Sequence, residues 1–324
     1  MRIVRYATPT GALVGYVDGD HVVPVANGDA PAGLAAVLDL AGAANADTSF
    51  RPAAVGDPVE LAAARLLSPV DHVPSIRDFY AFEQHVRTAR KRRGLEMHPD
   101  WYELPVFYFT NPAAVIGPGD EVQVPPRTRE LDFELEVAVV LCRGGRDVRI
   151  DEASDLVAGF LVMNDWSARD VQRREMQLSM GPVKGKDFAT SLGPYLVTRG
   201  EFAPGGLRDV PSATMTARVN GVEYSRNDLD TLYWSFAEML VYAGESVALK
   251  PGDVIGSGTC GTGCILELAL VHGGEKYPWL APGDEVELEV EGLGVLANPV
   301  VAASAPPFAR DEARRRPEVA EVPE

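Results

Sequence analysis

The chain has 324 residues, 46% of them hydrophobic, and carries a formal net charge of −17 at pH 7. This length supports one large hydrophobic core or two modest ones, and 31 Gly and 25 Pro residues favour a β-rich fold with many turns. The acidity argues against nucleic acid or an anionic membrane as a partner, because both require a basic surface. A small anionic substrate is still compatible with a local basic pocket.

The cysteines and the N-terminus indicate a cytoplasmic protein. Cys142, Cys260 and Cys264 are too few for a disulfide framework, as expected in a reducing compartment. The Cys260-x-x-x-Cys264 spacing could be half of a zinc site, but no second Cys/His pair completes it, so we interpret both as small buried residues in a glycine-rich turn. The sequence shows no signal peptide, and no apolar run approaches the ~20 residues needed to span a bilayer.

The chain divides into three predicted parts. Residues 1–68 are expected to form a small N-terminal α/β module, because Asp18-Gly19 between two apolar runs predicts a β-hairpin. The Ala-rich residues 31–65 of this module are expected to form short helices with loops. The main body is predicted at residues 69–303. A probably flexible tail at 304–324 is rich in Pro, Glu and Arg and has little apolar periodicity.

Two segments of the main body have helical periodicity. Apolar side chains recur every three to four residues over 76–95, and a second such segment is Leu232–Tyr242. The basic run 87–93 ends the first segment. A solvated helix face is the usual interpretation of such a run, and attraction of an anionic substrate is the alternative.

Turn signals predict that the main body is a β-roll or barrel. Pro-Gly-Asp triplets at 118–120, 251–253 and 282–284 each precede a strand-like run, and Pro followed by Gly is typical of a tight turn. Asn220-Gly221 predicts a further hairpin. The apolar run Cys264–Leu270, which contains Glu267, is predicted to be a strand.

Carboxylates on two predicted strands indicate a metal site. Alternation along 131–140 places Glu134 and Glu136 on one face, which taken alone is typical of a wet strand edge. The apolar residues that follow indicate instead that the strand enters the interior, where carboxylates require a cation or hydrogen-bond donors. Asp165 ends another apolar strand and can supply a third ligand. Such an oxygen-rich site is preferred by Mg²⁺, Mn²⁺ or Ca²⁺. For Arg169 and Asp170 nearby, a local ion pair is the plain alternative to a functional role.

Seven separated motifs, taken together, resemble the fumarylacetoacetate hydrolase superfamily over roughly residues 70–300. In chain order they are Asp78-Phe79-Tyr80, Gln84-His85, Glu134-Leu135-Glu136, Asn164–Asp170, Gly185-Lys186, Gly258-Thr259 and Glu267. The resemblance implies an α+β, mainly β fold: a β-roll with flanking helices and, in this chain, the small N-terminal module. It also implies a catalytic domain at 69–303 and a homodimer.

The resemblance implies roles for eleven residues. The metal ligands would be Asp78, Glu134, Glu136 and Asp165, holding Mg²⁺ or alternatively Mn²⁺ or Ca²⁺. The catalytic residues would be His85 as general base, Glu267 as its partner acid and Lys186 near the reacting carbonyl. Substrate-contacting positions would be Tyr80, Tyr108, Gln172 and Thr259. The arginine that binds the substrate carboxylate is left open among Arg90, Arg92 and Arg93.

The implied activity is metal-dependent hydrolysis of a C–C bond in a β-diketone acid of the acylpyruvate or fumarylacetoacetate type. The substrate would be a small anionic 2-oxo or 1,3-dicarbonyl acid, whose two oxygens a divalent ion can chelate. The alternative is a 2-oxo acid decarboxylase, tautomerase or hydratase that uses the same metal-enolate site. A non-catalytic binding protein is disfavoured, because it has no need of both a base and a full set of metal ligands.

Overall fold

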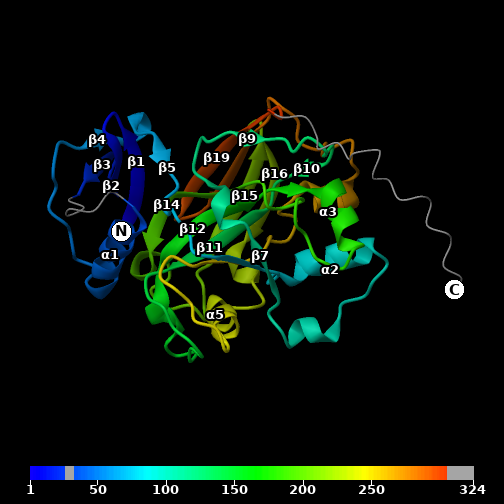
Figure 1. Cartoon of the computed structure of the whole chain (residues 1–324), viewed down its shortest axis with the longest axis horizontal. Coiled ribbons are helices and arrows are strands. Elements are labelled where there is room, and N and C mark those ends of the chain that lie inside the picture. The colour runs from blue at the N-terminus through cyan, green and yellow to red at the C-terminus, as the bar shows by residue number, and fades with distance from the viewer. Residues whose placement is uncertain (26–32, 305–324) are drawn as a thin grey trace, which may run out of the picture.

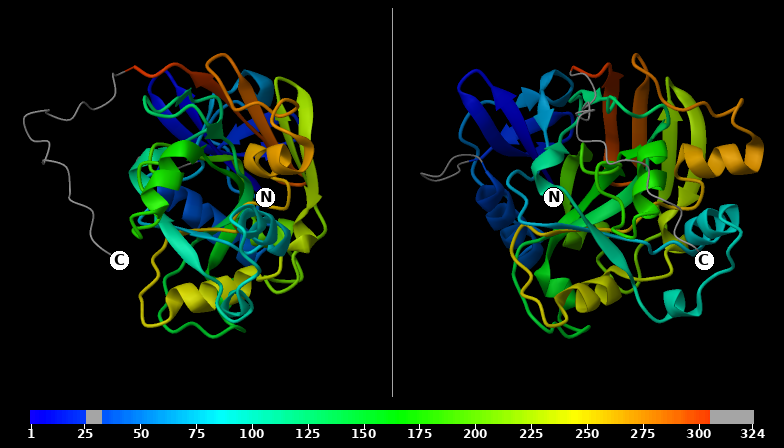
Figure 2. Two further views of the ribbon diagram at one scale, coloured as in Figure 1. Left: turned by 90° about the vertical axis from the view of Figure 1, so that its right-hand side faces the viewer. Right: turned by 45° about the vertical axis from the view of Figure 1, so that its right-hand side comes forward.

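The computed structural model describes residues 1–25 and 33–304 and shows an α+β fold that is mainly β (Figures 1 and 2). Apart from Ser304, the tail predicted at 304–324 lies outside the described residues. Within them, two large sheets and one small sheet are flanked by helices. No helix of the described chain is long and apolar enough to cross a membrane.

The larger sheet runs through most of the described chain. Its path joins β4 (Val59–Glu60), β3 (His21–Pro24), β2 (Gly11–Asp18), β1 (Arg2–Thr8), β14 (Thr190–Thr198), β12 (Val157–Asp165), β11 (Leu135–Leu141), β17 (Val254–Gly256), β6 (Ile76–Phe79) and β7 (Phe107–Thr110). Off this path, β5 (Leu66–Leu67) pairs with β1, and β8 (Val115–Ile116) pairs with β14. The predicted hairpin at Gly19 is confirmed, and β1 pairs antiparallel with β14, so the N-terminal strands continue the sheet of the main body.

The second sheet confirms the predicted turns. Its spatial order is β16 (Val222–Asp228), β15 (Thr214–Val219), β18 (Glu285–Val290), β19 (Gly294–Val301) and β9 (Val122–Gln123). Asn220 and Gly221 join β15 to β16 with φ of 52° and 75°, the positive values that a two-residue hairpin turn requires. The Pro-Gly-Asp turns lead into β9, β17 and β18. A separate two-stranded sheet pairs β10 (Leu131–Asp132) with β13 (Ser167–Ala168).

Side chains that alternate along β11 build two cores on opposite faces of the larger sheet. The helices are α1 (Leu34–Ala46), α2 (Glu83–Arg92), α3 (Arg169–Met176), α4 (Arg199–Phe202), α5 (Phe236–Gly244) and α6 (Ile265–His272). Val137 and Val139 belong to the core shared with the second sheet, whereas Ala138 and Val140 belong to the core shared with α1. Because side chains alternate along a strand, Glu136 lies on the same face as Ala138.

Two predicted elements differ from the structure because tertiary pairing overrides local periodicity. The helix predicted over 76–95 begins only at Glu83, since Ile76–Phe79 forms β6 between β17 and β7. The strand predicted at Cys264–Leu270 is helix α6. The Asp132 carboxylate accepts hydrogen bonds from the backbone N–H of Ile265 at 2.7 Å and of Leu266 at 3.0 Å, which satisfies donors of the first helical turn. A short apolar run does not by itself distinguish strand from helix.

Two further helical predictions hold only in part. Of the residues predicted at 31–65 to form short helices, those that the structure describes form α1, then the short strand β4, and then a short 3-10 helix at Leu61–Ala63. The helix predicted over Leu232–Tyr242 starts at Phe236, because the Ser235 side chain and Glu238 form a capping box that begins α5 there.

A substitution at Gly159 tests how closely β12 and β14 pack. A methyl group at this position would overlap the backbone carbonyl oxygen of Val197. We expect Gly159→Ala to lower the free energy of unfolding in urea by about 1–3 kcal/mol, the usual cost of overpacking. Gly42→Ala in α1 is the matched control, because no atom lies within 4 Å of its added methyl group and alanine favours a helix over glycine by up to about 1 kcal/mol. Equal effects of the two substitutions would contradict this packing argument.

Candidate metal centre

Four buried carboxylates meet on one face of the larger sheet. Asp78 comes from β6, Glu134 from the residue before β11, Glu136 from β11, and Asp165 from the end of β12. One carboxylate oxygen of each lies within 4.8 Å of those of the other three. None of the four residues is more than 4% exposed. Acids from three different strands therefore converge on one small volume.

The strand register explains why these acids converge. Gly256 of β17 pairs with Ala138 of β11 on one side and with Asp78 of β6 on the other. Asp78 therefore lies across β17 from the strand that carries Glu136. A methyl group at Gly256 would lie 2.6 Å from Asp78 Oδ1, so only glycine leaves room for this carboxylate. The backbone N–H of Gly258 donates a hydrogen bond to the same oxygen at 3.2 Å.

Two buried cations partly balance the negative charge. Lys186 Nζ contacts both Glu134 Oε2 and Asp165 Oδ2. Arg169 donates from its guanidinium to Glu134 Oε1 at 2.7 Å and to Asp132 Oδ2 at 2.8 Å. Burial opposes ionisation of Glu134, but the charges of Arg169 and Lys186 outweigh it and hold its pKa below the ordinary value. Glu134 is thus held as a carboxylate.

Near the other three acids, the positive charge of neighbouring side chains is too small to offset the effect of burial on their pKa values. Burial, together with the charge of neighbouring carboxylates, raises the pKa of Asp78 and of Glu136 well above the usual range, and burial raises that of Asp165 as well. Among the described residues, Glu136 Oε2 and Asp165 Oδ1 have no hydrogen-bond partner. A buried carboxylate oxygen without a partner is costly unless a cation binds it. The oxygen-only donor set fits a hard divalent cation.

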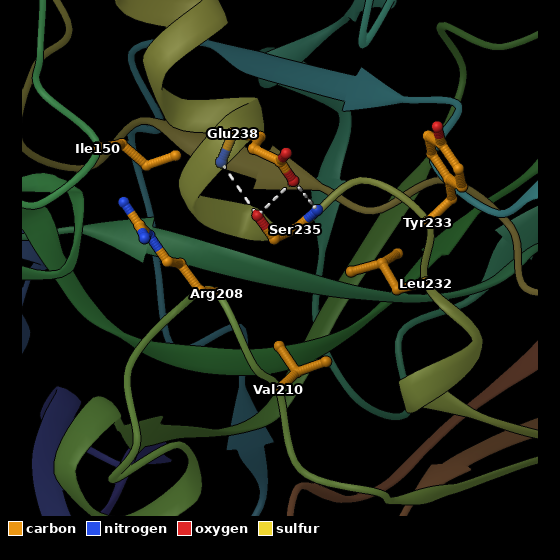
Figure 3. A pocket seen from close by; sticks show the side chains of 7 residues that line it. All are labelled: Ile150, Arg208, Val210, Leu232, Tyr233, Ser235 and Glu238. Carbon is orange, nitrogen blue, oxygen red and sulfur yellow. Dashed lines mark hydrogen bonds between the residues drawn. The ribbon is translucent and has the colours of Figure 1, made fainter. Parts of the chain in front are cut away.

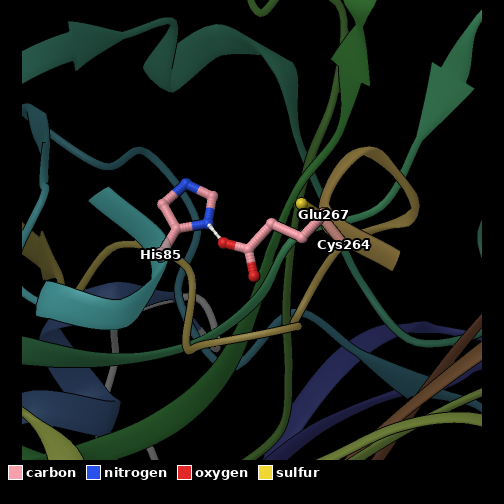
Figure 4. Close-up of side chains that lie close together, drawn as sticks. All are labelled: His85, Cys264 and Glu267. Atoms are coloured by element: carbon pink, nitrogen blue, oxygen red, sulfur yellow. Dashed lines mark ion pairs between the residues drawn. The ribbon is translucent and has the colours of Figure 1, made fainter. Parts of the chain in front are cut away.

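A histidine and a glutamate form a second buried pair beside these acids. His85 of α2 faces Glu267 of α6 through its Nδ1 atom, at ion-pair contact (Figure 4). Their side chains are 6% and 1% exposed. The second carboxylate oxygen of Glu267 accepts a hydrogen bond from the backbone N–H of Thr262. The ring of Tyr80 packs edge-on against the imidazole, with centroids 5.4 Å apart. The imidazole is therefore held in one orientation.

The remaining predicted substrate positions lie around the carboxylates. The Tyr108 hydroxyl donates to Asp165 Oδ2 at 2.5 Å, and the Thr259 hydroxyl donates to Glu136 Oε1 at 3.3 Å. Gln172 Oε1 accepts a hydrogen bond from Arg169 at 3.2 Å. The structure thus places Tyr108 and Thr259 directly on predicted metal ligands, whereas Gln172 reaches them only through Arg169.

The local ion pair considered for Arg169 and Asp170 is wrong. Arg169 is buried between Asp132 and Glu134, while Asp170 accepts hydrogen bonds from the Thr128 hydroxyl and the Arg129 backbone. The role of Arg169 as a cation of the site was not predicted from the sequence. The available signal was that Asp132 and Glu134 alternate in the sequence with apolar residues, because two acids on one buried face require a shared counter-charge.

A separate cavity of about 350 Å³ contains none of the predicted site residues (Figure 3). Its walls come from Ile150, from Arg208 and Val210, and from residues 232–238 at the start of α5. Ser235 and Glu238 in its wall hydrogen-bond to one another as the cap of that helix. Ser235 and Glu238 therefore have hydrogen-bond partners in the helix cap, whereas the carboxylate cluster contains buried oxygens without a partner.

Fold and site together define a β-rich protein with a buried cluster of four carboxylates suited to a metal ion and a histidine–glutamate pair next to it. Residues 75–301 match the family profile described as Fumarylacetoacetate (FAA) hydrolase C-terminal. The chain therefore belongs to the fumarylacetoacetate hydrolase family, as its motifs and its fold indicated. The family includes hydrolases, isomerases and tautomerases.

Three similar proteins illustrate this range. A fumarylacetoacetase of Arabidopsis thaliana is 29% identical over 266 residues, which cover 64% of this chain and 63% of that protein. The human mitochondrial oxaloacetate tautomerase FAHD2A is 35% identical over 201 residues, covering 61% and 59%. The chain thus spans about three fifths of these curated relatives. The structure of a 5-carboxymethyl-2-hydroxymuconate delta-isomerase from Mycobacterium smegmatis is 26% identical, with a TM-score of 0.68 and coverage of 93% of this chain and 100% of that one.

Glu136→Gln tests the metal centre. The substitution keeps the size of the side chain but replaces a charged ligand that has an unpartnered buried oxygen. We expect the affinity for Mn²⁺ or Mg²⁺, measured by titration calorimetry, to fall at least about tenfold. Glu285→Gln, at an exposed position of β18, is the matched control and should bind like the unmodified protein. Unchanged affinity in Glu136→Gln would contradict a metal site here.

Proposed function

We propose that the chain is a divalent-metal-dependent hydrolase that cleaves a C–C bond in a β-diketone acid of the acylpyruvate or fumarylacetoacetate type. The observation that carries the proposal is the buried His85–Glu267 pair next to the carboxylate cluster. Arg169 and Lys186 lower the pKa of Glu134, and a protonated His85 adds to this effect, which places the imidazole within electrostatic reach of the predicted metal ligands. A water-activating base beside a Lewis-acid site is the combination that hydrolysis requires.

The orientation of the imidazole gives His85 its proposed role. Nδ1 faces the Glu267 carboxylate, so Nδ1 carries the proton and Nε2 is free to accept one from water. The resulting hydroxide adds to a substrate carbonyl, and the carbon that departs takes the electron pair of the broken C–C bond. Protonation of that carbon by the imidazolium completes the reaction. Glu267 stabilises the imidazolium in the interval, as the acid of a catalytic triad does.

Lys186 and the four acids are proposed to serve the electrophilic side of the reaction. A divalent cation held by Asp78, Glu134, Glu136 and Asp165 would polarise the oxygens of a dicarbonyl substrate. Neighbouring acids raise the pKa of Lys186 against the effect of its burial, so its ammonium group keeps its charge. A fixed positive charge in a site that excludes water stabilises negative charge that develops on the substrate.

Arg93 is the proposed partner of the substrate carboxylate. Of the three competing arginines, Arg90 donates from Nε to the Glu96 carbonyl at 2.6 Å, whereas Arg93 donates from Nε to the Ala89 carbonyl at the longer distance of 3.4 Å. Burial raises the pKa of Tyr80, and the charge of Arg93 opposes that rise, so Arg93 lies electrostatically close to the predicted substrate position. Burial, together with the charges of Arg173 and Arg169, lowers the pKa of Arg92. This assignment agrees with a small anionic 2-oxo or 1,3-dicarbonyl acid as the substrate.

The alternative proposal is a tautomerase, isomerase, decarboxylase or hydratase that acts on a 2-oxo acid at the same centre. It is supported by the relatives, since one is named an oxaloacetate tautomerase and another a delta-isomerase. Such reactions move a proton next to the carbonyl and do not require a hydroxide to attack it. Mg²⁺, Mn²⁺ and Ca²⁺ all suit either chemistry at an oxygen-only site.

His85→Ala distinguishes the two proposals. With acylpyruvates and Mn²⁺, we expect turnover to fall by roughly 10²–10⁴-fold, the usual contribution of a general base, while Mn²⁺ affinity stays unchanged. Loss of the enol absorbance together with identification of the carboxylic acid product measures cleavage. His21→Ala, on an exposed position of β3, is the control. Full cleavage by His85→Ala would overturn the hydrolytic proposal. Conversion of oxaloacetate by the unmodified protein, without cleavage of any acylpyruvate, would favour the alternative.

A homodimer is proposed from the family resemblance and from one apolar surface. Leu178 and Met180, in the loop after α3, are 76% and 79% exposed, and Met176 and Val183 beside them are 44% and 47% exposed. A cluster of large exposed apolar side chains is typical of an interface. We expect light scattering on the purified protein to give about twice the chain mass and Met180→Glu to lower it. A monomeric unmodified protein would contradict the dimer.

A further inference from the structure

Cys264 joins the His85–Glu267 pair to form a cluster of three different ligand types. Its sulfur, an imidazole nitrogen of His85 and a carboxylate oxygen of Glu267 all lie within 4.8 Å of one another. Cys264 is the residue that precedes α6, so its side chain lies at the start of the helix that carries Glu267 (Figure 4). All three residues are buried, with exposed fractions of 0%, 5% and 1% for Cys264, His85 and Glu267.

Two buried polar atoms of this cluster make no hydrogen bond of regular geometry. In the part of the chain that the structure describes, His85 Nδ1 and Glu267 Oε1 face each other as an ion pair, yet neither atom makes a hydrogen bond of regular geometry. A buried cysteine alone is usually a small apolar residue. Cys264, however, places its sulfur within 4.8 Å of an imidazole nitrogen of His85 and a carboxylate oxygen of Glu267. The cluster therefore offers three donor atoms to a ligand that accepts electron pairs.

We propose that His85, Cys264 and Glu267 form a second metal site, selective for zinc, distinct from the site of the four carboxylates. Nitrogen, sulfur and oxygen donors are the ligands that Zn²⁺ prefers, and three protein ligands with a water in the fourth position are a common zinc geometry. Ligand atoms of a tetrahedral zinc site lie about 3.3–3.6 Å apart. Zinc binding would require the direct contact between His85 Nδ1 and Glu267 Oε1 to lengthen to this spacing.

The donor sets separate the two sites chemically. Magnesium binds thiolate and imidazole poorly and prefers the all-oxygen set, whereas zinc gains from sulfur and nitrogen. Zinc binding converts the Cys264 thiol to a thiolate, so one proton is released to solvent for each ion that binds. No oxidant or reductant is involved, because Zn²⁺ keeps its charge throughout.

A zinc ion at this site would inhibit the enzyme. Coordination occupies the His85 nitrogen that faces Glu267 and removes the acid that stabilises the imidazolium. This consequence rests on the proposed role of His85 as the general base, whereas the zinc site itself does not depend on it. Inhibition would persist at saturating Mg²⁺ or Mn²⁺, because those ions bind to the other set of ligands.

Cobalt(II) reports the proposed site independently of activity. Co²⁺ substitutes for zinc, and a bound thiolate gives it a charge-transfer band in the near ultraviolet. With the carboxylate site saturated by Mg²⁺, we expect this band in the unmodified protein and in Cys260→Ser, and its loss in Cys264→Ser. Cys260 is the matched control, because it is equally buried four residues earlier and is not one of the three clustered ligands. Absence of the band in the unmodified protein, or its persistence in Cys264→Ser, would overturn the site.

One further measurement keeps the inference testable if Cys264→Ser fails to fold, and a second applies when that variant folds. X-ray absorption of the zinc-loaded unmodified protein should show one sulfur at about 2.3 Å, and a first shell without sulfur would overturn the proposal. In the activity assay at saturating Mg²⁺, we expect Cys264→Ser to need at least tenfold more Zn²⁺ for half inhibition than Cys260→Ser. A cobalt band without inhibition by Zn²⁺ would retain the site and overturn the inhibition. A preparation that turns over no substrate would refute the proposed hydrolase, while the spectrum would still report the zinc site.

Discussion

The burial of four carboxylates in one small volume is the constraint on which the rest of the site depends. Charges of the same sign repel strongly in an interior of low dielectric constant, and each buried oxygen also loses its hydration. Lys186 and Arg169 neutralise part of this charge, and Arg169 does so while contacting Asp132 as well. The unpartnered oxygens of Glu136 and Asp165 mark where the compensation is incomplete. The sheet thus holds a site whose electrostatics call for a cation.

Asp132 links this charge balance to the His85–Glu267 pair. Its carboxylate accepts hydrogen bonds from Arg169 and from the first backbone N–H groups of α6. The same helix carries Glu267, which faces His85 on α2. One buried acid therefore fixes both a cation of the metal centre and the helix that orients the proposed base. Helix α6 also brings Cys264 to the same place, so the cluster proposed for zinc arises from the same anchoring.

Some elements of the fold were predicted correctly from the sequence and others were not, and the difference has a physical cause. The hairpin turns at Gly19 and Asn220-Gly221 were predicted correctly, because positive φ is a local requirement that only a few residues satisfy. The state of Ile76–Phe79 and of Cys264–Leu270 was predicted wrongly. In both segments the outcome depends on partners distant in sequence, namely the strands on either side of β6 and the carboxylate of Asp132. Local apolar periodicity contains no information about such partners.

The sequence by itself determined the family, the mainly β composition of the fold and the identity of the acids and the histidine, because these follow from residue types in a fixed order. Only the tertiary structure decided that Asp78, Glu134, Glu136 and Asp165 share one volume, since this depends on the register of strands brought together across β17. It also decided that Arg169 serves Glu134 rather than Asp170, and that Cys264 lies with His85 and Glu267. Contacts between residues far apart along the chain are set by packing, which no local pattern encodes.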